Sequence, residues 1–122
     1  MYDILFAADD DCCENLEVFL ENDALTIQGS KEGKYEIQDS TVWNGRKVWK
    51  QDKGRTNALW FSKKKEEWVI GTSVGNEQFG SPIFGPGSFK CPNEVGTQWT
   101  YFDQTIQDGG NDVSVKCRGK YQ

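Results

Sequence analysis

The sequence predicts a small all-β domain, either an antiparallel barrel or a sandwich. Most apolar residues occur in short runs separated by Gly, Asn, Asp or Lys clusters, as in strands joined by turns. Four cysteines stand as an adjacent pair, Cys12 and Cys13, and two singles, Cys91 and Cys117, in a chain without histidine. This spacing is typical of disulfides rather than of zinc sites. We therefore expect a single domain, residues 1–122, stapled by two disulfides.

Eight segments have the composition of strands. They are Leu16–Leu20, Ala24–Gln28, Lys34–Ile37, Lys47–Lys50, Ala58–Ser62, Trp68–Gly71, Trp99–Asp103 and Val113–Cys117. The first segment also fits helical spacing, but the strand alternation of Leu16, Val18 and Leu20 is preferred. Residues 71–87 hold five glycines and two prolines, which predicts a long irregular loop. Residues 1–11 are expected to form a flexible acidic segment.

Two hairpins are predicted from the turn signals and the apolar alternation. Asn44-Gly45 lies between two strand-like segments and is a strong signal for a two-residue turn. The second hairpin joins Leu59-Trp60-Phe61 to Trp68-Val69-Ile70. Alternation places Trp60 on one face and Leu59 and Phe61 on the other, so both faces of this ribbon are apolar. Such a ribbon needs cover on two sides, or it exposes a tryptophan for binding.

The disulfide connectivity can be narrowed from three possibilities to two. A bond between Cys12 and Cys13 would close a strained small ring, so each is expected to pair with a distant cysteine. Cys13 with Cys117 and Cys12 with Cys91 is the preferred arrangement, and the exchanged pairs are the alternative. Either arrangement ties the two ends of the domain together and indicates a secreted or extracellular protein. Four free thiols in a cytosolic protein is the competing interpretation.

The charge of the chain argues against some partners. The formal net charge is -5 and the isoelectric point is about 4.7, so phosphate repulsion disfavours nucleic acid and anionic membranes. The short basic run Lys63-Lys64-Lys65 is followed at once by two glutamates and is interpreted as a solvated hairpin tip. No stretch approaches the roughly 20 apolar residues of a membrane span, so membrane insertion is not expected.

No catalytic residues, cofactor or metal site are predicted. Because the chain has no histidine, a serine or cysteine nucleophile would lack its usual base. The sequence also has no nucleophile elbow, Ser-x-x-Lys motif or zinc-protease helix. Two carboxylates could support glycoside hydrolysis, but acidic side chains are more often simply solvated on the surface. The candidates are Asp9, Asp10, Asp11, Glu14, Glu36, Asp103 and Asp108. The run 9–11 and the segment 108–112 could also ligate calcium, although neither has the spacing of an EF-hand loop.

The five tryptophans supply the candidate ligand-binding residues. They are Trp43, Trp49, Trp60, Trp68 and Trp99, and each could be buried in the core or could anchor a protein or stack on a sugar. Trp43 beside the turn and Trp49 among basic residues are the most exposed candidates, although a core position is still favoured for each. Arg46 is the third candidate, because Asn44-Gly45-Arg46 is a tripeptide that some cell-surface receptors recognise. The turn itself explains the same residues without a partner.

Several short motifs occur in a fixed order along the chain. They are Gly33-x-Tyr35, Asn44-Gly45-Arg46-x-Val48-Trp49-Lys50, Leu59-Trp60-Phe61, Trp68-Val69-Ile70-Gly71, Cys91-Pro92, Trp99-x-Tyr101 and Val113-x-Val115-x-Cys117. In this order they resemble a small β module of large secreted or surface proteins of marine invertebrates and algae. The match covers roughly residues 13–117, with Trp49 where the pattern more often has Tyr and Lys47 where it often has Pro. The resemblance implies a non-enzymatic recognition or structural unit and transfers no catalytic residue.

Together these observations favour a secreted binding module that acts without chemistry. The leading function is binding of an extracellular protein, and the alternative is binding of a carbohydrate through exposed tryptophans. A role as an enzyme inhibitor or as a carboxylate-based hydrolase ranks third. We expect a monomer or a weak homo-oligomer. An exposed tryptophan beside Asp and Asn in a shallow groove would favour a sugar, whereas a flatter apolar patch with a polar rim would favour a protein.

Overall fold

The computed structural model describes residues 12–72, 74 and 82–118. Its described strands form a single antiparallel sheet that curls into a half-barrel, so the predicted all-β fold is confirmed. The strands follow the spatial order β8-β7-β6-β5-β4-β3-β2-β1-β9. Their bounds are β1 (Asn15–Leu20), β2 (Gly33–Trp43), β3 (Arg46–Gln51), β4 (Ala58–Ser62), β5 (Glu67–Gly71), β6 (Ile83–Pro86), β7 (Thr100–Asp103), β8 (Thr105–Asp108) and β9 (Val113–Arg118).

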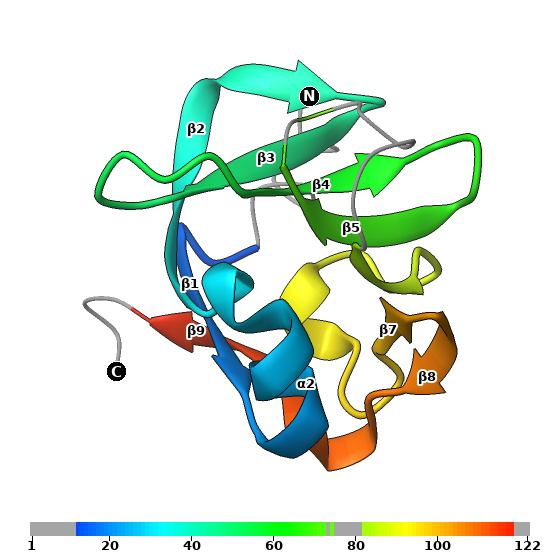
Figure 1. Cartoon of the computed structure of the whole chain (residues 1–122). Helices are drawn as coiled ribbons and strands as arrows, with labels where there is room; N and C mark the ends of the chain where they lie inside the picture. Colours follow the sequence, from blue (N-terminus) through cyan, green and yellow to red (C-terminus); the bar gives the residue numbers. More distant parts are fainter. Residues whose placement is uncertain (1–11, 73, 75–81, 119–122) are drawn as a thin grey trace.

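One predicted strand is a helix. Residues 24–28 lie in α2 (Asn22–Gln28), so the prediction of a strand there is wrong. Ala24 and Gln28, four residues apart, are its buried residues and face the same side of the helix. Thr26 and Ile27 have strand propensity, but packing of this one face outweighs it. Figure 1 shows α2 lying across the lower half of the molecule, with β2 to β5 above it.

Two strands are absent from the sequence prediction. The predicted irregular loop over 71–87 ends in β6, which pairs with β5 and β7. Glycine and proline content concealed this strand, since both residues are depleted in sheets. The other is β8, which pairs with β7 across the tight turn at Gln104 and forms one end of the sheet. The predicted flexible segment 1–11 lies outside the described residues.

The core lies on the inner face of the sheet, and a smaller apolar cluster lies on the outer face. Leu59, Phe61, Trp68 and Ile70 belong to the main core. Trp60 and Val69, which alternate with them along β4 and β5, belong to a second cluster. That cluster consists of Val48, Ala58, Trp60 and Val69, with Val74 packed against it. The prediction that both faces of the β4–β5 ribbon are apolar is therefore confirmed.

Short polar connections tie α2 and the last loop to the sheet. The Gln28 side-chain amide donates to the carbonyl of Phe102 at 3.0 Å, and Asn22 donates through Nδ2 to the Asp112 carboxylate at 2.9 Å. The backbone amide of Gly109 donates to the Trp99 carbonyl at 2.8 Å. These bonds connect α2 with β7 and with η3 (Gly110–Asp112), which leads into β9, so the two ends of the sheet are linked.

Replacing Gly87 by alanine is expected to lower the free energy of unfolding by about 3 kcal/mol, because the site is overpacked. A Cβ atom there would clash with the Phe61 ring and would lie 2.5 Å from the Glu66 carbonyl oxygen. The Gly87 amide donates to that same oxygen at 3.0 Å, so the backbone cannot move away without losing a hydrogen bond. Urea denaturation followed by tryptophan fluorescence measures the loss.

Gly71→Ala is the matched control, because the nearest atom to its added Cβ is 3.7 Å away. Its free energy of unfolding should stay within about 1 kcal/mol of the wild-type value. Equal stabilities of the two variants would contradict the close packing at Gly87.

Candidate functional site

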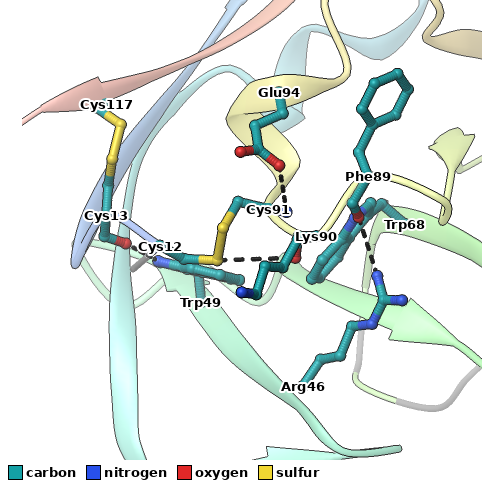
Figure 2. The surroundings of a disulfide bond; sticks show 10 residues. All are labelled: Cys12, Cys13, Arg46, Trp49, Trp68, Phe89, Lys90, Cys91, Glu94 and Cys117. Carbon is teal, nitrogen blue, oxygen red and sulfur yellow. Dashed lines mark hydrogen bonds between the residues drawn. A yellow bond between two sulfur atoms is a disulfide. The ribbon is translucent and has the colours of Figure 1, made fainter. Parts of the chain in front are cut away.

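Both predicted disulfides are present in the preferred arrangement. Cys12 bonds to Cys91 and Cys13 bonds to Cys117, with Cα–Cα separations of 5.4 and 5.7 Å. Figure 2 shows the two bridges leaving adjacent residues toward different parts of the chain. Glu94 supports one of them, since its carboxylate accepts the amide hydrogen of Cys91 at 3.1 Å. The segment before β1 is thus joined covalently to the segment before η2 (Pro92–Glu94) and to β9.

Trp49 lies in the core, which is the position that the sequence favours for it, although it is also a candidate for exposure. Its side chain is fully buried, and its Nε1 donates to the Cys13 carbonyl at 2.9 Å (Figure 2). Its ring packs edge-on against Trp68, with centroids 6.0 Å apart. The charged neighbour Lys50 did not indicate the face of Trp49, because adjacent strand residues point to opposite faces. Trp49 is therefore unavailable as a contact residue on the folded surface.

Arg46 is a structural residue of the hairpin. Its guanidinium lies 3.8 Å from the Phe61 ring centroid and 5.3 Å from that of Trp68. One of its nitrogens donates to the Phe89 carbonyl at 3.0 Å, and Trp68 Nε1 donates to the same oxygen at 2.9 Å (Figure 2). Stacking on an aromatic face stabilises a cation by about 0.5–2 kcal/mol. These contacts hold Arg46 against the protein itself, which weakens its candidacy for ligand binding.

Trp43 is exposed, at the tip of the β2–β3 hairpin, so the core position that was favoured for it is wrong. The predicted turn is confirmed: Asn44 and Gly45 have φ angles of 55° and 82°, as a two-residue hairpin turn requires. Trp43 is 40 % exposed and Val42 beside it is 64 % exposed. Asn44 donates through Nδ2 to the Phe61 carbonyl at 2.9 Å, which fixes the tip against β4. We call Val42 and Trp43, with the turn 44–45, the hairpin tip.

Sequence reasoning missed a second exposed apolar pair. Phe102 on β7 and Ile106 on β8 are paired across the ribbon and are 38 % and 64 % exposed. Val42 was missed as well, although its place next to the Asn-Gly turn could have indicated an exposed position. The Phe102–Ile106 pair matches the hairpin tip in exposure, so it provides control positions for experiments on the tip.

The candidate acidic residues lie on different elements. Glu14 precedes β1, Glu36 is on β2, and Asp103 and Asp108 lie at opposite ends of the β7–β8 ribbon. The Asp108 carboxylate accepts the Gly110 amide hydrogen at 2.9 Å, as in a turn. No group of three or more metal-ligating side chains occurs among the described residues. The acidic run 9–11 lies outside them.

Among the residues that the structure describes, three titratable groups have shifted pKa values, and burial is the first cause of each shift. Burial raises the pKa of Tyr35, whose hydroxyl donates to the Lys31 carbonyl at 2.7 Å. Burial also raises the pKa of Tyr101, and the nearby carboxylates, including Asp103, raise it further. Burial lowers the pKa of Lys31, whose ammonium donates to the side-chain carbonyl of Gln28 at 2.6 Å. The bonds of Tyr35 and Lys31 connect β2 and α2 to the short turn 29–31.

No known protein family, curated protein or solved structure matches the chain. The resemblance to an extracellular β module therefore stays a prediction. Across residues 12–72, 74 and 82–118, no helix is both long and apolar enough to cross a membrane.

Proposed function

We propose that this domain is a secreted, non-enzymatic recognition module that binds an extracellular protein through the hairpin tip. The observation that carries the proposal is the exposure of Val42 and Trp43 beside a turn that Asn44 anchors to β4 and that Arg46 anchors to Phe89. Tryptophan is the residue most enriched among the strongest contacts of protein interfaces. A rigid tip also loses little conformational freedom on binding, which favours affinity.

The surroundings of the tip indicate the chemistry of the partner. Asn44 contacts the end of β4, and the exposed turn Lys63-Lys64-Lys65 begins two residues after its acceptor, Phe61. An apolar tip bonded to a strand that leads into a turn with three exposed lysines is complementary to an apolar patch with acidic residues at its rim. The two disulfides support an extracellular setting, because such bonds are rare in reducing compartments.

A carbohydrate ligand is supported less well by the same geometry. An exposed tryptophan in a shallow groove with free polar neighbours would favour a sugar. The side-chain amide of Asn44 is instead used within the protein, and the described groove on the outer face of the sheet is not lined by Trp43. The tip is thus closer to the apolar patch of a protein interface.

The proposal is tested by probing arrays of extracellular proteins and of glycans with the oxidised domain. We expect at least one protein to bind, with the affinity reduced at least about tenfold by Trp43→Ala. Phe102→Ala is the matched control, because it removes an aromatic ring of similar exposure from β7. Binding to glycans alone, or equal losses in both variants, would contradict protein recognition by the hairpin tip.

A further inference from the structure

A groove lies on the outer face of the sheet, away from the hairpin tip and the disulfides. It has a volume of about 560 Å³, within the range of about 300–1,000 Å³ found for small-molecule sites. β2, β3, β4 and the loop between β3 and β4 supply its lining. The lining residues are Gln38, Val48, Lys50, Gly54, Arg55, Thr56, Ala58 and Val74.

The floor of the groove is apolar. Val48 and Ala58 belong to the outer cluster, and Val74 packs against the same cluster. Val48 and Ala58 are almost fully buried within the protein, so the floor is formed by well-packed side chains. The apolar surface that a ligand can still cover is therefore that of Val74, which is partly exposed, and of the aliphatic parts of Lys50 and Arg55.

Among the described residues, the charged groups in the lining are Lys50 and Arg55, which are both cationic and both exposed. One nitrogen of the Arg55 guanidinium donates to the Ser30 carbonyl at a long distance of 3.4 Å, which leaves most of its five N–H donors for other acceptors. Glu36 lies opposite Lys50 on β2, but no ion pair joins these two side chains in the described part of the chain. Gln38 and Thr56 add neutral polar groups at the rim.

We propose that this groove binds a small organic anion, with its carboxylate or sulfate group at the charged ends of Lys50 and Arg55 and its apolar body against Val74 and the aliphatic parts of the same two side chains. Arginine and lysine together bind such oxyanions by charge-assisted hydrogen bonds. The overall charge of -5 disfavours non-specific binding of anions, so the local cations determine where the anion is held. This site is independent of the recognition surface proposed above.

The probe is 4-phenylbutanoate, titrated into the isotopically labelled domain and followed by amide chemical shifts. We expect shifts centred on residues 48–58, and a dissociation constant about fivefold higher for Lys50→Gln because one partly exposed charge contact is lost. The neutral amide of the probe should also bind at least about fivefold more weakly. Lys64→Gln is the matched control, since it removes an exposed cation from the β4–β5 turn, and it should bind as the wild type does.

Four results would overturn the proposal. These are an absence of shifts in the groove at millimolar probe, shifts centred elsewhere, equal affinity for the acid and the amide, and equal weakening by Lys50→Gln and Lys64→Gln. Trp43→Ala should leave probe binding unchanged, so failure at the groove can be distinguished from failure of the hairpin tip.

Discussion

Replacing Cys13 and Cys117 together by serine is expected to lower the free energy of unfolding by about 4–5 kcal/mol. The two cysteines are 104 residues apart, and a crosslink over such a distance removes much of the entropy of the unfolded chain. The loss is large compared with the total stability of about 5–15 kcal/mol of a typical domain. Urea denaturation without reductant, followed by tryptophan fluorescence, gives the difference.

The second bridge provides an internal comparison. Cys12 and Cys91 are 79 residues apart, so their double serine variant should be destabilised by nearly the same amount, since the effect varies only with the logarithm of loop length. Full reduction of the wild type should cost more than either variant. Identical denaturation curves for the reduced and oxidised wild type would show that the bridges do not stabilise the fold.

Trp49→Ala is expected to lower the free energy of unfolding by about 3–5 kcal/mol, the usual cost of deleting a buried aromatic side chain. The variant loses the edge-on contact with Trp68, and it leaves the Cys13 carbonyl without its indole donor. Thermal or urea denaturation of the oxidised protein measures this loss. Partner binding should fall only to the extent that the domain unfolds.

Trp43→Ala is the matched control for this prediction, because it removes the same side chain from a partly exposed site. Its free energy of unfolding should change by less than about 1 kcal/mol, as for most surface substitutions. The reverse order of the two stabilities would contradict the assignment of Trp49 to the core and of Trp43 to the surface.

The features that sequence predicted well depend on local rules. The Asn44-Gly45 turn requires positive φ angles that these two residues readily adopt. The two faces of the β4–β5 ribbon follow from strand alternation alone. The disulfide pairing could be narrowed because adjacent cysteines cannot easily bond to each other, and the structure contains the preferred pairs.

The features that sequence missed depend on tertiary contacts. Residues 22–28 form helix α2 despite their strand propensity, because the helix lets Ala24 and Gln28 face the interior together. Strand β6 contains glycine and proline, yet Gly85 is required where a Cβ would lie 2.9 Å from the Trp99 ring. Arg46 looked available in the sequence, but its aromatic partners come from β4 and β5.

The candidate sites show the same division. Trp43 could be named as a candidate from the sequence because it adjoins a turn, but its exposure could not, since a core position was favoured for it. The anion groove could not be named, since its lining comes from residues 38–74, which lie on separate strands and loops. No short motif joins Lys50, Arg55 and the apolar floor, so only the folded arrangement brings them together.

Hydrogen–deuterium exchange of the oxidised domain, with and without a protein partner identified on the array, tests recognition by the hairpin tip most directly. We expect the partner to slow exchange at amides 42–47 and to leave β7 and β8 unchanged, because the tip is the proposed contact surface. Protection confined to residues 100–108, with amides 42–47 unaffected, would place the interface on the Phe102–Ile106 pair and contradict the proposed role of the tip.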